Sequence, residues 1–207
     1  LDAVQALMPG LRWTADDVVA GFAGVRTLQD EDTDSLAAVS REFVITEPKP
    51  GLVWPIGGKY TTARCDSAEI VDRVLELLGR EPVACATARR PLPGAPMEAA
   101  GLGEFTGWQA EALSALARRE IDDEAAHFLT LRHGTGLPRI HALLDENPAW
   151  AARLHPDAPF LVAEAVLALR EEMAHSAEDV LRRRMPLKLL VRDPAAAVRQ
   201  VEALLAG

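Results

Sequence analysis

The chain is poor in cysteine and aromatic residues and has no long hydrophobic run. Its 207 residues contain two cysteines, Cys65 and Cys85, and aromatic residues make up 5%. Two cysteines are too few for a disulfide framework, and they do not have the spacing of a metal site. We therefore expect a reducing, cytoplasmic setting. The apolar runs fall well short of the roughly 20 residues that a membrane-spanning helix needs, so we predict no transmembrane segment.

Basic residues are also in deficit. The chain has 22 Lys and Arg against 31 Asp and Glu, a net charge of −9, which argues against nucleic-acid binding. Glu171 and His175 lie one turn apart on a predicted helix, but no third ligand accompanies them, so we predict no metal site. The chain starts at Leu1 and enters a predicted helix, residues 2–8, at once. We expect a piece of a longer polypeptide.

The most informative stretch is residues 51–79, which predicts a strand, a glycine turn and a helix. The apolar run 52–56 predicts a short buried strand. Apolar spacing over 61–78 predicts a helix, and Gly79 stands where a helix C′ glycine belongs. Glu69 and Arg73 are spaced for an exposed i,i+4 pair.

Between the strand and the helix lies the turn Gly57-Gly58-Lys59-Tyr60-Thr61-Thr62. Glycines let the backbone turn sharply and let a ligand approach the main chain. The first helical turn presents free N–H groups and about half a positive charge, to which Lys59 adds a full charge. The turn suits an anion, or a group that becomes anionic during reaction. The alternative is a plain connection with Thr61 or Thr62 as N-cap, and spacing alone leaves both open.

Upstream of this turn the pattern predicts β-structure. The segment 18–28 and the segment 41–46 both predict strands. Arg26 is the only charge in the first of them, and a buried charge needs a partner. Its planar guanidinium suits a carboxylate or phosphate ligand, and a structural salt bridge to an acid within 30–34 is the alternative.

From residue 80 onward the pattern is helical. The expected fold class is α+β, with a short β segment, residues 1–79, followed by an all-α domain, residues 80–207. Gly101-x-Gly103-x-x-x-Gly107 follows no predicted strand, so we interpret it as a loop and not as a nucleotide motif. The expected helices lie at 108–119, 122–133, 138–144, 148–154, 160–174 and from 194 onward.

Several stretches, in this order and spacing, resemble the C-terminal part of FAD-dependent glycerol-3-phosphate dehydrogenase. They cover nearly the whole chain, which makes the resemblance far more specific than one glycine motif. The stretches are 23–28 (AGVRTL), 40–45 (SREFVI), 51–64 (GLVWPIGGKYTTAR), 91–95 (PLPGA), 132–134 (RHG) and 163–184.

The resemblance implies oxidation of sn-glycerol 3-phosphate to dihydroxyacetone phosphate, with FAD as hydride acceptor and quinone as electron sink. Residues 1–79 would end the FAD- and substrate-binding domain, and residues 80–207 would be the family's helical C-terminal domain. Arg26 and Lys59 would bind substrate. Gly57, Gly58, Lys59, Tyr60 and Thr61 would face FAD, where Lys59 and the helix N-terminus would stabilise negative charge on the reduced cofactor.

The resemblance places the catalytic base before Leu1, so none is named here. It implies a cytoplasmic protein that binds peripherally at the inner face of the membrane, and it leaves a homodimer open. Two other hypotheses remain. One is a helical interaction module without turnover. The other is a related FAD-dependent amino-acid or hydroxy-acid oxidase, in which Arg26 would hold a carboxylate.

Overall fold

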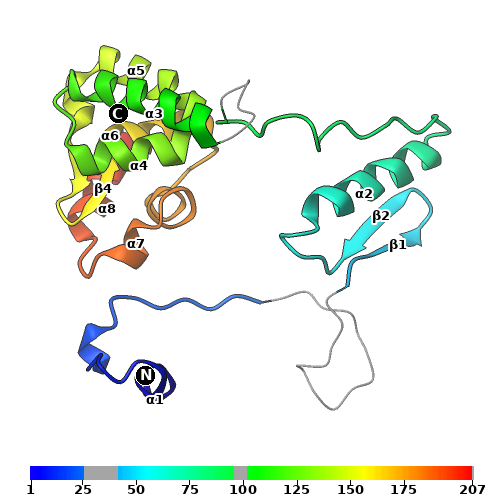
Figure 1. The fold of residues 1–207 in the computed structure, drawn as a ribbon, viewed down its shortest axis with the longest axis horizontal. Helices are drawn as coiled ribbons and strands as arrows, with labels where there is room; N and C mark the ends of the chain where they lie inside the picture. The colour runs from blue at the N-terminus through cyan, green and yellow to red at the C-terminus, as the bar shows by residue number, and fades with distance from the viewer. Residues whose placement is uncertain (26–41, 96–101, 207) are drawn as a thin grey trace. The chain divides into compact units, whose positions relative to one another are not determined.

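The structure, a computed structural model, describes residues 1–25, 42–95 and 102–206 of the chain, with side chains from residue 105 in the last range. It contains two compact units (Figure 1). The smaller unit is Ala23–Pro91, and the larger combines Leu1–Phe22 with Leu92–Gly207. Each unit is described by itself below. The domain boundary between residues 79 and 80 stays a prediction.

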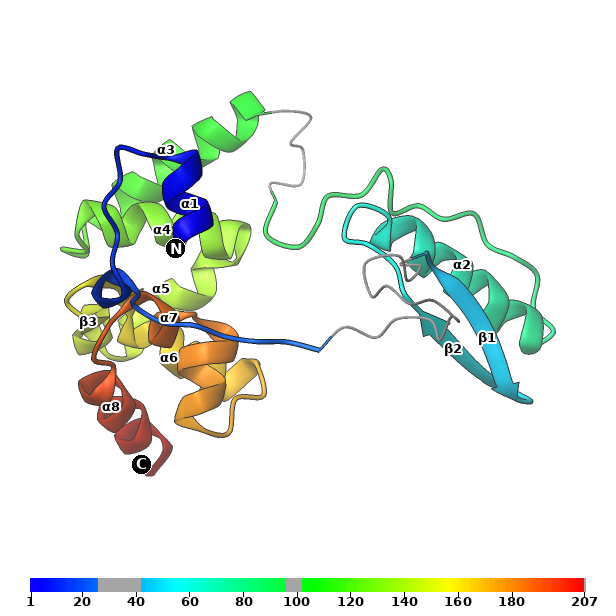
Figure 2. The ribbon, with the colours of Figure 1, turned by 90° about the horizontal axis from the view of Figure 1, so that it is seen from below.

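The smaller unit is a β-hairpin with one helix packed on it (Figures 1 and 2). Strands β1 (Val44–Lys49) and β2 (Leu52–Ile56) pair antiparallel, with Val44 opposite Ile56, and α2 (Ala63–Leu77) packs on β2. Gly79 has a φ of +64°, and the Arg80 amide donates to the Leu75 carbonyl at 2.9 Å, which closes the helix as a Schellman motif. The strand, helix and glycine cap predicted in this stretch are confirmed.

One predicted side-chain pair in this unit is wrong. Arg73 does not pair with Glu69; its guanidinium binds Glu47 at 2.6 Å and Glu76 at 2.5 Å. Glu47 also accepts the Gly51 amide at 2.9 Å, and this bond, followed by Arg73, lowers its pKa. Local spacing identified the arginine, but the tertiary partner on β1 lies outside the reach of an i,i+4 rule.

The smaller unit has no core of its own within its described residues. None of residues 42–91 is buried. Trp54, Val71 and Leu78 expose 52%, 55% and 62% of their surface. An isolated two-stranded hairpin is marginally stable, and one helix does not supply the missing apolar contacts. The predicted apolar face of the helix is therefore present but only partly covered by the described residues.

The N-terminal segment differs in part from expectation. Helix α1 (Asp2–Leu7) confirms the predicted helix, and a 3₁₀ turn, η1 (Ala15–Asp17), follows it. Residues 18–25 carry no strand, so that prediction is wrong for them, and residues 26–28 lie outside the described residues. A strand needs a neighbour to hydrogen-bond with, and no described segment pairs with 18–25.

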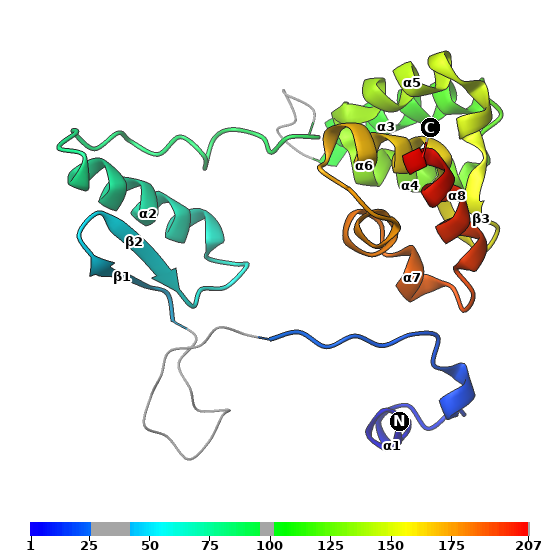
Figure 3. The same cartoon turned by 180° about the vertical axis from the view of Figure 1, so that it is seen from behind.

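The larger unit is a helical bundle with one small hairpin (Figure 3). Strands β3 and β4 pair antiparallel, with Arg153 opposite Leu161. The α+β fold class is confirmed. The elements are α3 (Leu102–Ala117), α4 (Asp123–His133), η2 (Gly134–Gly136), α5 (Leu137–Glu146), η3 (Pro148–Ala151), β3 (Arg153–His155), β4 (Ala158–Leu161), α6 (Val162–Glu171), the π-helical turn η4 (Asp179–Arg184), α7 (Leu187–Leu190) and α8 (Ala195–Ala206).

Two details of this unit were not predicted. Helix α3 begins at Leu102, in the segment interpreted as a loop, and the hairpin β3–β4 occupies part of two segments assigned to helices. Leu154, Ala158 and Phe160 of the hairpin are buried. Short apolar runs of this kind do not distinguish strand from helix by periodicity, so tertiary contacts decided the outcome.

The core of the larger unit lies between its helices. Buried apolar residues extend from Leu116 to Val201, and α6 contributes to the core along most of its length. A helix that is apolar nearly all round belongs in the middle of a domain. The largest side chains that are almost wholly buried include Leu116, Leu129, Ile140, Leu161, Leu167, Leu181, Leu187 and Val201.

One carboxylate is buried within this core. Glu164, with 5% of its side chain exposed, accepts bonds from Arg132 at 2.7 and 2.9 Å and lies 3.0 Å from His133 Nε2. It also accepts the Leu161 amide at 2.8 Å, which caps the start of α6. Arg132 further donates to the Pro159 carbonyl at 2.6 Å. We call Arg132, His133, Leu161 and Glu164 the Glu164 cluster.

Burial raises the pKa of Glu164, but the bonds from His133 and Arg132 outweigh burial and hold its pKa below the ordinary value. The contribution of Glu164 to stability is thus fully present above its unfolded pKa, about 4.3, and is lost as the pH falls through the lowered folded value.

We expect Glu164→Gln to destabilise the larger unit by about 3 kcal/mol, because it leaves Arg132 beside a neutral partner inside the core. Native-state amide exchange in α4 and α6 measures the loss. Glu171→Gln is the matched control, since Glu171 pairs with Arg139 at the surface, where both side chains are nearly half exposed, and should cost less than about 1 kcal/mol. Equal effects of the two substitutions would contradict a structural role for the Glu164 cluster.

Candidate functional site

The glycine turn leads from β2 into α2 as the sequence predicted. Gly57 and Gly58 have φ values of +76° and +100°, in the left-handed region where glycine is favoured. Lys59, Tyr60 and Thr61 follow, all exposed, and Thr62 is the N-cap residue of α2. The predicted residues Gly57, Gly58, Lys59, Tyr60 and Thr61 thus form one continuous turn, in which Gly58 is half-buried and the others are exposed.

The turn retains free hydrogen-bond donors. No described residue accepts a hydrogen bond from the backbone N–H of Lys59, Tyr60 or Thr61. Lys59 makes no ion pair within the part of the chain that the structure describes. The Thr62 amide is satisfied by the Lys59 carbonyl at 3.1 Å. The turn can therefore offer three amides and one ammonium group to an acceptor.

Asp66 lies at the same helix end, and the sequence analysis missed it. Its carboxylate accepts the Thr62 hydroxyl at 2.8 Å, and a Cβ placed on Gly58 would lie 3.1 Å from Asp66 Oδ2. A carboxylate in the first helical turn offsets part of the positive end of the helix. The spacing of Thr62 and Asp66, one helical turn apart, was the available signal.

The structure brings together only part of the predicted site. Arg26 lies outside the described residues, so its distance from Lys59 is undetermined. Tyr60, the only tyrosine of the chain, is fully exposed. The turn residues are thus accessible and contiguous, but the described residues form no enclosed pocket around them.

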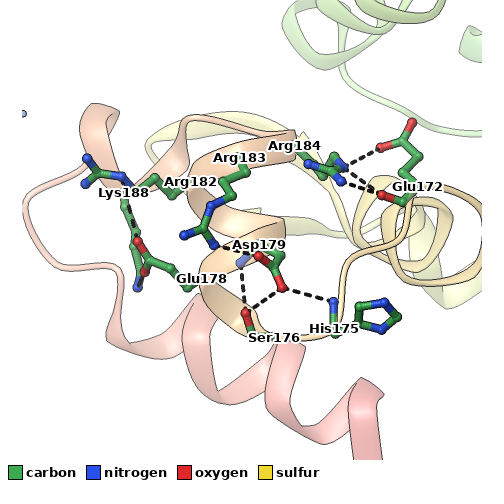
Figure 4. A network of polar contacts seen from close by, with 9 residues as sticks. All are labelled: Glu172, His175, Ser176, Glu178, Asp179, Arg182, Arg183, Arg184 and Lys188. Carbon is green, nitrogen blue, oxygen red and sulfur yellow. Dashed lines mark hydrogen bonds and ion pairs between the residues drawn. The ribbon is translucent and has the colours of Figure 1, made fainter. Parts of the chain in front are cut away.

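The basic run Arg182–Arg184 is committed to ion pairs and caps (Figure 4). Arg183 binds Asp179 at 2.6 Å, and Arg184 donates to the Glu172 carbonyl at 2.9 and 2.6 Å. The Ser176 hydroxyl and the His175 amide hold the pKa of Asp179 at about 2. These contacts explain the run as the closure of a π-helical turn and leave little charge for an external anion.

A surface cavity of about 480 Å³ lies in the larger unit, lined by Ala115, Arg118, Arg119 and His141. Burial, followed by the charge of Arg119, lowers the pKa of His141. Arg119 is paired with Asp145 at 2.7 Å. The pairing of Arg119 and the negative dipole end of α3 offset part of the positive charge at this cavity, and Arg118 adds to it.

Within the described residues, no three His, Cys, Asp or Glu side chains are grouped as a metal site would require. Glu171 binds Arg139, and the His175 amide donates to Asp179. None of the described helices combines the length and the apolar character needed to cross a membrane.

Comparison with known proteins identifies a family over most of the chain. Residues 85–207 match the model of the C-terminal domain of alpha-glycerophosphate oxidase. A glycerol-3-phosphate dehydrogenase of Synechocystis sp. is 32% identical over 90% of this chain and 33% of its own length. The mitochondrial glycerol-3-phosphate dehydrogenase SDP6 of Arabidopsis thaliana is 29% identical over 100% of this chain and 34% of its own. The chain thus spans about a third of the length of these relatives.

The turn yields a prediction for Gly58. In Gly58→Ala, the added Cβ meets Asp66 Oδ2 at 3.1 Å while the backbone stays in a left-handed conformation, so we expect the start of α2 to loosen. Amide exchange at Cys65 and Asp66 should accelerate. Gly107→Ala in α3 is the control, since its Cβ would meet nothing within 4 Å. Unchanged exchange in Gly58→Ala would show that the turn does not require glycine.

Proposed function

The chain belongs to the family of the C-terminal domain of alpha-glycerophosphate oxidase, and on that premise we propose that it forms the C-terminal part of an FAD-dependent glycerol-3-phosphate dehydrogenase. The reaction would convert sn-glycerol 3-phosphate to dihydroxyacetone phosphate. The membership confirms the resemblance drawn from the sequence motifs. The observation that carries the proposal is the exposed turn Gly57–Thr61 with its unbonded amides and Lys59, within a chain whose relatives are named glycerol-3-phosphate dehydrogenases.

The structure of the smaller unit supports its place in a larger domain. Its hairpin and helix bury no described residue and expose Trp54, Val71 and Leu78. Apolar surface of this extent is stable once another layer covers it. We propose that residues 1–79 complete the FAD- and substrate-binding domain and that residues 80–207 form the helical domain.

The residues of the turn offer the hydrogen-bond donors and the positive charge that would suit FAD. Gly57 and Gly58 hold the left-handed backbone that makes the turn, and the amides of Lys59, Tyr60 and Thr61 have no acceptor among the described residues. When bound, FAD supplies the acceptor for the hydride removed from the substrate. Gly57, Gly58, Lys59, Tyr60 and Thr61 are the residues that would hold it.

Lys59 would supply fixed positive charge next to the reacting groups. Its ammonium group and the N-terminal end of α2 both favour a neighbouring negative charge. Asp66 opposes them, so the net field at the turn depends on the balance between Lys59 and Asp66. Arg26 would bind the substrate phosphate through its planar guanidinium.

The remaining assignments follow from the same proposal. Quinone would accept the electrons, and the protein would associate peripherally with the inner face of the cell membrane. Its compartment would be the cytoplasm. The catalytic base would lie outside this chain.

The charge balance at the turn gives a matched pair of substitutions. Lys59→Gln should weaken binding of glycerol 3-phosphate or FAD roughly tenfold, because it removes a charge-assisted donor. Asp66→Asn keeps the hydrogen bond to Thr62 but removes the opposing charge, so it should strengthen binding about 2- to 5-fold. KM and the FAD dissociation constant of the complete enzyme measure both effects. Shifts of the same sign, or no shift in either variant, would argue against an anion at this turn.

Arg26 gives the test of substrate binding. Arg26→Ala should raise the KM for glycerol 3-phosphate about 10- to 100-fold through loss of a charged, bidentate contact, while FAD stays bound. Arg80→Ala, beyond the end of α2, is the control and should leave the KM unchanged. Wild-type kinetics in Arg26→Ala would remove this residue from the site.

A further inference from the structure

The segment that opens the larger unit is a built turn. The Ala95 amide donates to the Leu92 carbonyl at 3.0 Å, and Gly94 has a φ of +93°. Proline at the second position and a left-handed glycine at the third are typical of a type II turn. Residues 92–95 therefore form a defined turn whose own hydrogen bond does not use the Gly94 carbonyl.

That carbonyl is bound by η2, the 3₁₀ turn that follows α4. The Thr135 amide donates to the Gly94 carbonyl at 2.9 Å, and the Thr135 hydroxyl donates to the Ala95 carbonyl at 3.4 Å. A Cβ on Gly134 would lie 1.8 Å from the Gly94 oxygen and 2.7 Å from its carbonyl carbon. The two backbones therefore approach so closely that position 134 accommodates only glycine.

On the Gly134 side of this contact, the backbone is held in place by its neighbours. Gly134 follows directly on Arg132 and His133, whose side chains are bound to the buried Glu164 of α6. The end of α4 cannot shift without breaking the Glu164 cluster. The turn at 92–95 thus docks onto a rigid edge of the core.

The contact also coincides with a boundary. The second segment of the larger unit begins at Leu92, two residues before Gly94, and Pro91 belongs to the smaller unit. No helix or strand occurs between the end of α2 and residue 92. The attachment of residues 92–95 therefore decides how much irregular chain separates the two units.

We propose that the close backbone contact between Gly94 and Gly134, which we call the clasp, fixes the residue at which the helical unit begins. When the clasp is closed, the helical unit begins at Leu92. Open, it releases residues 92–95 and lengthens the connection to α2. The clasp does not depend on the proposed flavin chemistry.

The test uses the whole chain and the exchange of single amides. In Gly134→Ala the clasp cannot close, so the Thr135 amide should exchange at least about tenfold faster than in the wild type. The Leu161 amide, which donates to Glu164, should keep its wild-type rate, which distinguishes opening of the clasp from unfolding. Trypsin should also cleave faster after Arg89, just before the turn.

Gly136→Ala is the matched control, because it lies in the same 3₁₀ turn and its Cβ would meet nothing within 4 Å. Wild-type exchange is expected there. If Gly134→Ala does not fold, Gly94→Ala is the second variant. Its Cβ would lie 3.4 Å from the His133 carbonyl and its φ of +93° is strained for alanine, so a smaller acceleration at Thr135 is expected. Wild-type exchange of Thr135 in the folded glycine variants would overturn the clasp.

Discussion

The buried carboxylate of Glu164 is the interaction on which the larger unit depends. It joins the end of α4, through Arg132 and His133, to the first turn of α6, through the Leu161 amide. A charge in an apolar core is tolerated only when its hydrogen-bonding capacity is filled. Here the partners that fill it also fix two helices relative to each other. Gly134 follows these partners directly, so the edge that receives the turn at 92–95 inherits their rigidity.

The elements of the smaller unit are set by local sequence signals and not by a buried interaction. Its strand, turn and helix were predictable because local signals coincide: an apolar run, two glycines, helical spacing and Gly79 as a cap. Its packing was not predictable, because Arg73 forms an ion pair with Glu47 of β1 and not with Glu69 of its own helix. The predicted strand at 18–25 is absent for a related reason. A strand forms where a neighbouring segment pairs with it, and composition alone does not supply that segment. The hairpin β3–β4 was not predicted because its residues are mostly buried and do not show the alternation of apolar and polar residues that marks a half-exposed strand.

The candidate site was predicted to a similar extent. Glycine spacing and Lys59 marked the turn, and the structure places its residues together with unbonded amides. Asp66 was missed because a carboxylate in a first helical turn is ordinary capping, although its charge opposes that of Lys59 and of the helix N-terminus. Arg26 lies outside the described residues, so its role stays a proposal. A site assembled from distant segments cannot be completed from one of them, and the chain spans about a third of its relatives.

We propose that this chain supplies one wall of a flavin site at which glycerol 3-phosphate is oxidised. The most direct measurement is the visible spectrum of the complete protein that carries the chain, recorded before and after adding glycerol 3-phosphate without an electron acceptor. The account predicts a bound flavin whose oxidised absorption is bleached by glycerol 3-phosphate but not by amino acids or hydroxy acids. A protein without flavin, or a flavin bleached by amino acids and not by glycerol 3-phosphate, would contradict it.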